Sequence, residues 1–348
     1  MKLFFYVHVV CWTEGLRIKN NRGPLADEFP FYHSTEEIHA TVISLSRSCR
    51  APFSFHTVKC GLSCNIDVVD IGNPKNSNKV FYLFGEHARE LISPETAVHL
   101  MQELCAENPS QQTIEALKTS HFRIIPNGNP VSRREVESGS FCLRANPNGV
   151  DLNRNWDSHW TKDSPANNFQ DQVNPGTKPF SESETQAFRI AVSEFNPSVF
   201  AAIHSGTLGM YMPWAVSDES SKVRNALQMN QVLSELDSRY CKCPSGSAAQ
   251  QVGYDSPGTC LDWVHSNTNA SYSFAFEIFT GYGVEELRDR YKAQSNRLLR
   301  SSFLDVEETL MNRNCFTQFN PESKTDFVRT VHNWSKALLD LSIMTAKK

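Results

Sequence analysis

The chain has 348 residues, of which 40% are apolar and 21% are charged, and its formal net charge is −4. This composition allows a large buried core and excludes a collagen-like or disordered chain. Because the charge is nearly balanced and Lys and Arg form no stripe, we expect no binding to nucleic acid.

We interpret residues 1–30 as a signal or another N-terminal extension. Lys2 precedes an apolar run over residues 3–12, as at the front of a secretory signal. His8 interrupts this run and no small-residue cleavage motif follows it, so a short buried strand is the alternative. The run is too short to cross a bilayer as a helix, and we expect no membrane span.

The ten cysteines indicate an oxidising compartment, and therefore a secreted protein with disulfides. Two Asn-x-Ser sequons, which would suit a glycoprotein, begin at Asn269 and Asn333. The pairing of the cysteines cannot be read from the sequence. The close pairs Cys60-x3-Cys64 and Cys241-x-Cys243 leave a structural zinc site open as an alternative to disulfides.

Residues 31–342 alternate between helical and strand patterns, which predicts a single α/β domain. We expect a central twisted sheet of about eight strands, parallel and antiparallel mixed, with helices on both faces. In chain order, the first half predicts a helix from the Ser34 capping box to about 48, two strands within 57–71, a strand at 79–84, a helix at 93–105 and a strand at 121–126.

Residues 127–180 are polar and rich in Asn, Pro and Gly, and we expect a long functional loop. The second half then predicts a helix at 181–195, a strand at 198–203, helices at 220–240 and 260–265, a strand at 271–278 and a last helix from 320 to about 342. In open α/β sheets, ligands bind at the carboxyl ends of strands. His87, His204 and Glu277 fall near such ends, as one active site would require.

The segment 85–90, Gly-Glu-His-Ala-Arg-Glu, follows the strand at 79–84. His87 and Glu90 are three residues apart, so an imidazole and a carboxylate can face the same metal ion. The pattern alone is weak, because His33-x-x-Glu36 repeats it. In that second case the acid stands in the first turn of a helix, where the helix dipole already favours it.

His204 is the best candidate for a third metal ligand, because it ends an apolar strand. Glu277 lies inside another apolar strand, where a carboxylate is costly unless it is paired or has a task. Beside a metal it could take a proton from water. A hydrogen-bonded structural histidine and a salt-bridged core glutamate are the alternatives.

Asn153 and Arg154 lie in the long polar loop, and Arg144 precedes them by about nine residues. The guanidinium of arginine binds a carboxylate with two parallel hydrogen bonds, and asparagine adds a donor. A surface ion pair is the alternative interpretation.

Taken together, these residues resemble a known family, the zinc metallocarboxypeptidases of the carboxypeptidase A-like group. The resemblance covers about residues 31–340 and is closest in look to plant-like and protist-like members. The matching positions, in the family's order, are His87, Glu90, Arg144, Asn153, Arg154, His204, Ser205, Tyr254 and Glu277. Tyr254 is followed nine residues later by Trp263, as in the family.

The resemblance implies one Zn²⁺ per chain, bound by His87, Glu90 and His204. It implies that Glu277 is the general base for the attacking water and that Arg144 polarises the scissile carbonyl. The enzyme would be a carboxypeptidase, acting on the C-termini of peptides or proteins. We expect a monomer.

Substrate-binding roles follow from the same resemblance. Asn153, Arg154 and Tyr254 would bind the terminal carboxylate, and Arg89 would contact the substrate one subsite further out. Leu261 would line the base of the specificity pocket. Because no acid is placed there, we expect a preference for apolar or aromatic C-terminal residues.

Other functions stay open at this point. The enzyme could remove basic residues or hydrolyse acyl-amino acids, since both kinds of substrate also carry a terminal carboxylate. A non-catalytic binding protein that retains the fold is the alternative of another class. The chain also departs from the digestive enzymes, because Gly206 stands where they carry Tyr. We also expect no inhibitory prodomain of the kind that the digestive zymogens carry, because fewer than about 30 residues precede the catalytic pattern.

Overall fold

The computed structural model describes residues 23–61, 63–162, 172–217, 222–281 and 304–346. The apolar run at 3–12 lies outside these residues. Within them, no helix combines the length and the apolar character that crossing a membrane requires.

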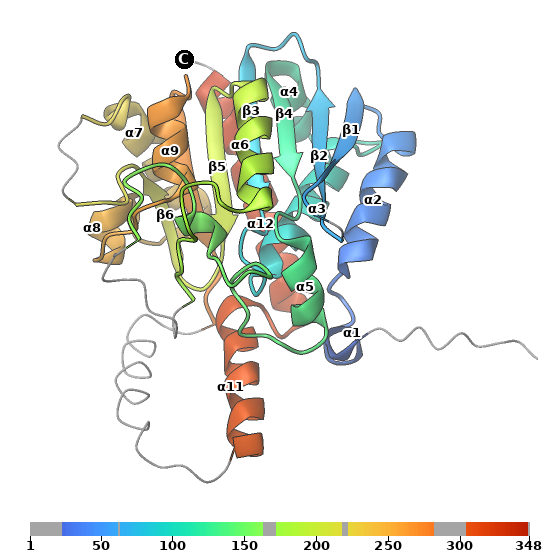
Figure 1. Cartoon of the computed structure of the whole chain (residues 1–348). Coiled ribbons are helices and arrows are strands. Elements are labelled where there is room, and N and C mark those ends of the chain that lie inside the picture. The colour runs from blue at the N-terminus through green and yellow to red at the C-terminus, as the bar shows by residue number, and fades with distance from the viewer. Residues whose placement is uncertain (1–22, 62, 163–171, 218–221, 282–303, 347–348) are drawn as a thin grey trace, which may run out of the picture.

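Eight strands form one mixed sheet in the order β1-β2-β4-β3-β5-β8-β6-β7 (Figure 1). Their bounds are β1 Phe53–Lys59, β2 Asn65–Gly72, β3 Asn78–Phe84, β4 Ser120–Ile125, β5 Val199–His204, β6 Leu208–Met212, β7 Ser245–Ser247 and β8 Tyr272–Ile278. The four central strands β4, β3, β5 and β8 are parallel to one another. Strands β1 and β2 pair antiparallel with their neighbours, and β6 pairs antiparallel with β8 but parallel with β7. The predicted fold class is confirmed.

Helices cover both faces of this sheet (Figure 1). One face carries α2 Thr35–Ser48, α3 Ile92–Leu104, α4 Gln111–Thr119, α7 Ala226–Leu236 and α12 Lys324–Ala346. The other carries α6 Ser183–Phe195 and α9 Cys260–Asn267. Strand β3 shows why both faces are apolar: Tyr82 belongs to the first core and Phe81 to the second, because successive side chains of a strand point to opposite faces.

Short elements complete the fold. They are α1 Pro24–Glu28, α5 Pro130–Glu137, the 3₁₀ turn Leu152–Arg154, the π-helical turn Asp237–Cys241, α8 Ala248–Val252 and α11 Leu304–Phe319. The capping box is confirmed, since Ser34 Oγ accepts from the Glu37 N–H and the Glu37 carboxylate accepts from the Ser34 N–H. The predicted loop 127–180 contains α5, and the helix predicted at 220–240 is the shorter α7. Helices α4 and α11 and strands β6 and β7 were not predicted.

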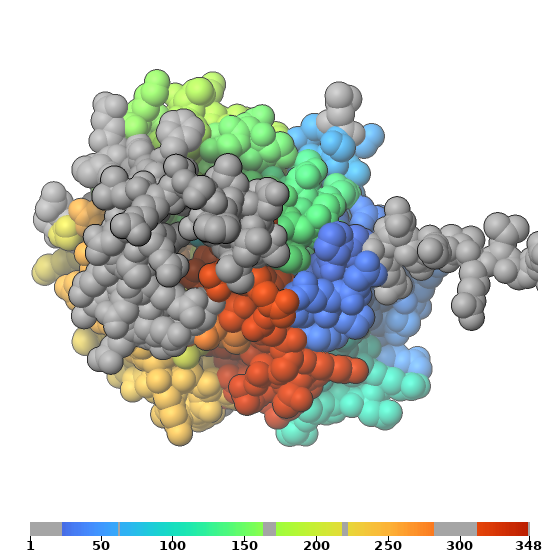
Figure 2. All heavy atoms as spheres, turned by 90° about the horizontal axis from the view of Figure 1, so that it is seen from below, coloured from blue at the N-terminus to red at the C-terminus, as the bar shows by residue number. Residues whose placement is uncertain are grey.

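The first residues that the structure describes pack against α11. Phe29 stacks on Phe316 with ring centroids 3.9 Å apart, and Arg313 forms an ion pair with Glu28. Figure 2 shows the red C-terminal segment beside the blue N-terminal one. Leu25 and Phe29, which belong to the predicted extension 1–30, are therefore part of the main core.

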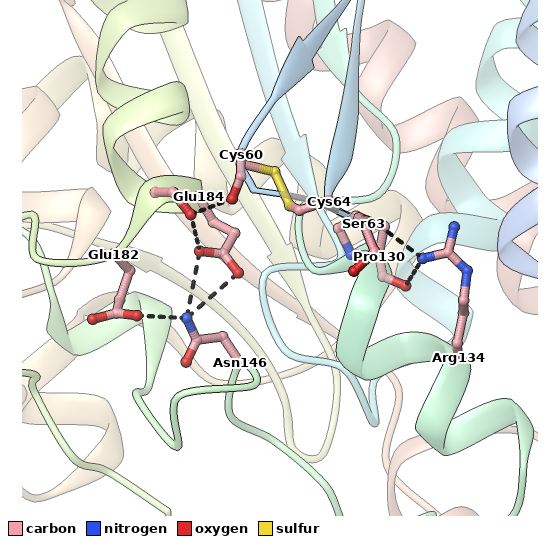
Figure 3. The surroundings of a disulfide bond; sticks show 9 residues. Cys60, Ser63, Cys64, Pro130, Arg134, Asn146, Glu182 and Glu184 are labelled. Carbon is pink, nitrogen blue, oxygen red and sulfur yellow. Dashed lines mark hydrogen bonds between the residues drawn. A yellow bond between two sulfur atoms is a disulfide. The ribbon is translucent and has the colours of Figure 1, made fainter.

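Eight of the cysteines form disulfides, and Cys260 is free and buried. The pairs are Cys49–Cys105, Cys60–Cys64, Cys142–Cys315 and Cys241–Cys243. The structural zinc site considered for the two close pairs is therefore wrong, because zinc binds thiolates and these sulfurs are joined to each other. Figure 3 shows the Cys60–Cys64 bridge beside the start of α6, where Ser183 Oγ donates to the Cys60 carbonyl.

The two sequons differ in their surroundings. Asn269 is exposed. Asn333 lies within α12, and its side-chain amide donates to the Tyr240 carbonyl at 2.9 Å. This bond occupies the nitrogen to which a glycan would be attached, so Asn269 is the better acceptor.

Candidate functional site

The first part of the site is the turn that follows β3. Gly85 has φ +67°, and a Cβ on it would lie 2.8 Å from Pro94 Cγ, so only glycine fits where the chain leaves the strand. The turn buries His87 and Glu90, which are 3% and 2% exposed. His87 Nδ1 lies 2.7 Å from Glu90 Oε1. The structure thus brings the two side chains together.

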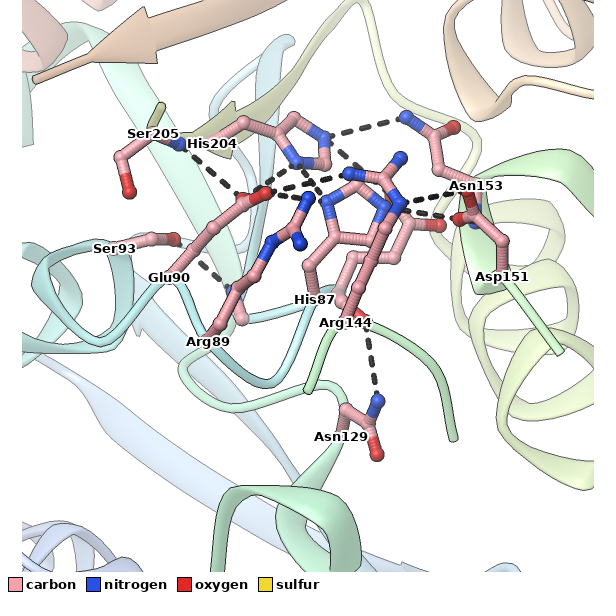
Figure 4. A network of polar contacts seen from close by, with 12 residues as sticks. His87, Arg89, Glu90, Ser93, Asn129, Arg144, Asp151, Asn153, His204 and Ser205 are labelled. Carbon is pink, nitrogen blue, oxygen red and sulfur yellow. Dashed lines mark hydrogen bonds and ion pairs between the residues drawn. The ribbon is translucent and has the colours of Figure 1, made fainter. Parts of the chain in front are cut away.

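His204 joins them from the end of β5, the parallel neighbour of β3 (Figure 4). Its Nδ1 lies 3.0 Å from Glu90 Oε2 and 3.2 Å from His87 Nδ1. The ligand atoms of these three residues all lie within 4.8 Å of one another. Burial lowers the pKa of His204, but Glu90 outweighs it and raises that pKa to about 9. The point where the three side chains meet therefore favours positive charge.

Glu277 is placed beside His204 by the sheet register. The two residues are paired on the parallel strands β5 and β8. Glu277 Oε2 is buried and has no hydrogen-bond partner among the described residues. Burial, together with the Glu90 carboxylate, raises the pKa of Glu277 to about 7, while His204 opposes this rise. A buried carboxylate oxygen without a partner is costly, so it marks a place where a ligand or water binds.

Asp151 completes the arrangement and was not predicted. His87 Nε2 lies 3.0 Å from Asp151 Oδ1, and Arg144 Nε donates to Asp151 Oδ2 at 2.8 Å. Burial would raise the pKa of Asp151, but Arg144 and His87 hold it well below its usual value. Metal-binding histidines commonly donate their second N–H to a carboxylate, and an acid two residues before Asn153 was the available signal.

Asn153 and Arg154 lie in the 3₁₀ turn next to this carboxylate. Gly258 approaches so closely that a Cβ on it would lie 2.1 Å from the Arg154 carbonyl oxygen. Arg154 is 7% exposed, and it donates to the Asn153 carbonyl and to Ser256 Oγ. Its Nε is buried without a partner, and among the described residues no carboxylate forms an ion pair with it. This buried cation can therefore accept an anionic ligand.

Tyr254 and Arg89 contact the site less directly than the residues described above. Tyr254 is 57% exposed. Arg89 donates to the Cys142 carbonyl at 3.3 Å, and its guanidinium lies 4.1 Å from the centroid of the Phe319 ring. A Cβ on Gly206 would lie 2.2 Å from that ring. The glycine at this position is thus explained by Phe319, which approaches from the end of α11.

Leu261 lies in a small apolar cluster next to β8. The cluster contains Tyr211, Ala215, Ala248 and Leu261, with Val252 and Ala275 packed against it. Ala275 is two residues before Glu277 and therefore shares its face of the strand. Asp262, next to Leu261, uses both carboxylate oxygens to accept the Ala215 N–H.

The second His-x-x-Glu pattern forms no such site. His33 Nδ1 lies 2.6 Å from Glu95 Oε2, and the His33 side chain is 37% exposed. Glu36 instead accepts a hydrogen bond from Arg134 Nε. The two residues thus face different partners, as the capped-helix interpretation implies.

Comparison with known proteins agrees with this geometry. Residues 50–284 match the family described as zinc carboxypeptidase. The chain belongs to the zinc carboxypeptidase family. It is 26% identical over 286 residues to zinc carboxypeptidase A 1 of Anopheles gambiae, which covers 76% of this chain and 64% of that protein. It is 25% identical over 271 residues to carboxypeptidase B of Astacus astacus, covering 71% and 86%.

Solved structures show the same fold. A crystal structure of thrombin-activatable fibrinolysis inhibitor superposes with a TM-score of 0.71 at 21% identity, covering 91% of this chain and 75% of that one. A carboxypeptidase A from Helicoverpa armigera superposes with a TM-score of 0.66 at 18% identity, covering 91% and 75%. The single α/β domain with its eight-stranded sheet is thus the carboxypeptidase fold.

We predict that His33 contributes to stability in a pH-dependent way. The hydrogen bond that His33 donates to the Glu95 carboxylate raises the pKa of His33 above 6.5, against the effect of burial. The folded protein therefore favours protonated His33. Its contribution is complete below the unfolded-state pKa and is lost as pH rises through the raised pKa. His33→Ala should lower the free energy of unfolding by about 0.5–1 kcal/mol near pH ~5.5 and by less near pH ~9.

Urea unfolding at the two pH values measures this difference. Zinc affinity, measured in parallel, should not change in the His33→Ala variant. An equal loss of stability at both pH values would contradict the role assigned to the Glu95 contact.

Proposed function

We propose that this member of the family is a zinc-dependent exopeptidase that hydrolyses the C-terminal peptide bond of peptides and proteins. The observation that supports it best is the buried guanidinium of Arg154, which has no carboxylate partner among the described residues. It lies in the same loop as Asp151, which contacts the candidate metal ligand His87. A substrate with a free terminal carboxylate would supply the missing anion.

The donor set fits zinc. Two histidines and one glutamate are a known ligand set for catalytic zinc, which leaves a further position open. Zn²⁺ held by His87, Glu90 and His204 would act as a Lewis acid and lower the pKa of water. The buried Oε2 of Glu277, without a partner, lies beside this set and supports the assignment.

The chain's own residues would carry the proton and stabilise the developing charge. Glu277 would take a proton from the attacking water and later pass it to the leaving amine. Arg144 would donate to the oxygen of the scissile carbonyl as negative charge develops on it. Asp151 holds the Arg144 side chain in place through the bond to Nε, which leaves the other guanidinium nitrogens for the substrate. Glu90 Oε1 is 3.7 Å from Arg144 Nη1.

The terminal carboxylate would be bound by Arg154, with Asn153 as a second donor. Tyr254 is exposed at present and would approach when substrate is bound. Arg89 would contact a residue further from the scissile bond. These roles explain why the enzyme would act at chain ends rather than within a chain.

We further propose a preference for apolar or aromatic C-terminal residues. The cluster around Leu261 offers apolar and small side chains. The nearby acid, Asp262, already accepts a backbone N–H. Relatives named carboxypeptidase A and carboxypeptidase B match this chain at similar identity, 26% and 25%, so similarity does not decide between the two preferences.

We place the protein in the secretory pathway or outside the cell, as a monomer. The four disulfides among the described residues support the location, because disulfides are rare in reducing compartments. The exposed sequon at Asn269 is consistent with it.

Removal of the general base or of the metal should abolish peptidase activity. Glu277→Gln keeps the size of the side chain but cannot accept the proton. We expect kcat to fall about 10²–10⁴-fold while zinc remains bound at one per chain. A chelator should inactivate the wild-type enzyme, and Zn²⁺ should restore it. Unchanged turnover in Glu277→Gln would contradict the mechanism and favour a non-catalytic protein or another base.

The proposed binding of the terminal carboxylate can be tested with two peptides that differ only at the C-terminus. A peptide with a free C-terminus should be cleaved about 10²-fold more efficiently than the same peptide with a C-terminal amide, because charge-assisted hydrogen bonds contribute about 1.5–3 kcal/mol. Arg154→Met should remove most of this ratio of kcat/KM values. Arg239→Met, which changes an exposed arginine, is the matched control. Equal cleavage of both peptides by the wild type would rule out an exopeptidase.

The pocket preference predicts the outcome of a substrate series. Peptides that end in Phe or Leu should be cleaved better than those that end in Lys or Glu. Leu261→Asp should shift the preference toward Lys by at least about 10-fold in kcat/KM, because it places a carboxylate in an apolar cluster. A wild-type preference for Lys or Arg would contradict the pocket assignment.

A further inference from the structure

A second buried carboxylate lies directly behind the candidate metal ligands. Glu86, which immediately precedes His87, is 1% exposed. Trp156 Nε1 donates to Glu86 Oε1 at 3.0 Å, and Cys260 Sγ contacts Oε2 at 3.6 Å. The mechanism above gives this acid no role, although burying a carboxylate is costly. The burial of the Glu86 carboxylate beside the candidate metal ligands therefore needs an explanation.

The Glu86 carboxylate also lies near His204, the candidate metal ligand from β5. His204 Nε2 lies 3.5 Å from Glu86 Oε2, which is the oxygen not held by Trp156. His204 Nδ1 is the nitrogen that faces Glu90 and His87. When Nδ1 offers its lone pair to a metal, the neutral imidazole carries its proton on Nε2. That N–H therefore needs an acceptor.

Glu86 is the group suited to accept it. Among the described residues, His204 Nε2 also lies 3.4 Å from Asn153 Nδ2. An amide nitrogen is a donor and cannot accept the imidazole N–H. The amide oxygen of Asn153 is already engaged, since it accepts the Cys260 N–H at 2.9 Å. The orientation of Asn153 is thus fixed, and Glu86 Oε2 supplies the acceptor.

We propose that Glu86 is a positioning residue for the metal site, which fixes the tautomer and orientation of His204 as Asp151 does for His87. This inference rests on the proposed zinc site. Each metal-binding histidine then has its own buried carboxylate, one from the turn after β3 and one from the loop before Asn153. A carboxylate in this position makes the imidazole a stronger ligand, and its loss commonly lowers metal affinity.

A second metal ion is the competing explanation. The ligand atoms of Glu86, His204 and Cys260 also lie within 4.8 Å of one another. Such a site would require His204 to bind a metal through each of its two nitrogens. It would also take one oxygen of Glu86 while Trp156 holds the other. A single metal with Glu86 as an acceptor satisfies the same contacts and requires no second ion.

The experiment measures zinc affinity and stoichiometry. Competition with a chelator gives the dissociation constant of Zn²⁺ for the wild type and for Glu86→Leu, Glu86→Gln and Glu184→Gln. We expect Glu86→Leu to bind Zn²⁺ about 10–100-fold more weakly. Glu86→Gln should also weaken binding, because one amide oxygen cannot accept from both Trp156 and His204. Glu184 is another buried carboxylate, whose hydrogen bonds come from Asn146 and Ser183 rather than from a candidate metal ligand, so it is the matched control and should leave affinity unchanged.

A second measurement does not depend on a stable variant. In zinc-loaded wild-type protein labelled with ¹⁵N-histidine, the Nε2–H protons of both His87 and His204 should resist exchange with solvent. Fast exchange of the His204 proton would overturn the proposal, as would unchanged affinity in Glu86→Leu. Two zinc ions per chain would also overturn it in favour of the second metal. A wild type that binds no zinc would overturn the zinc site itself, and this inference with it.

Discussion

The structure depends on the convergence of two imidazole nitrogens and one carboxylate at the buried ends of β3 and β5. His87 and His204 present their Nδ1 atoms to each other at 3.2 Å, with Glu90 between them and solvent excluded. Two nitrogen lone pairs at this distance repel unless a proton or a metal ion lies between them. The parallel register of the central strands imposes this approach, because it brings the two strand ends to the same edge of the sheet.

The acidic side chains around the two histidines determine the charge of the site. Four carboxylates lie within or against it: Glu86, Glu90, Asp151 and Glu277. Arg144 pairs with two of them, so the buried charge remains negative without a cation. A divalent ion held by His87, Glu90 and His204 would offset that charge.

Much of the fold and many of the candidate site residues could be predicted from the sequence, for one common reason. The strands β3, β5 and β8 are dense apolar runs, and the polar residues at their ends stand out against them. Glu86 could not be predicted, because its importance lies in a contact with one particular ring nitrogen of His204. Asp151 was not predicted, although it stands two residues before Asn153, because its contact with His87 is not visible in the sequence. Helix α11 was missed for a related reason: its partners Phe29 and Phe141 are distant in sequence. The substrate-binding roles of Tyr254, Arg89 and Leu261 stay predictions.

The Cys142–Cys315 bridge sets an order for the maturation of this site. Cys142 lies two residues before Arg144, whereas Cys315 belongs to α11, 173 residues later. At about 5–20 residues per second, the ribosome adds Cys315 roughly 9–35 s after Cys142. By then the candidate metal ligands have been synthesised, as have Glu86 and Asp151. The loop that carries Arg144, however, is not yet linked to α11 by the disulfide. Complete assembly of the site thus waits for the synthesis of α11 and for an oxidant that joins the two sulfurs.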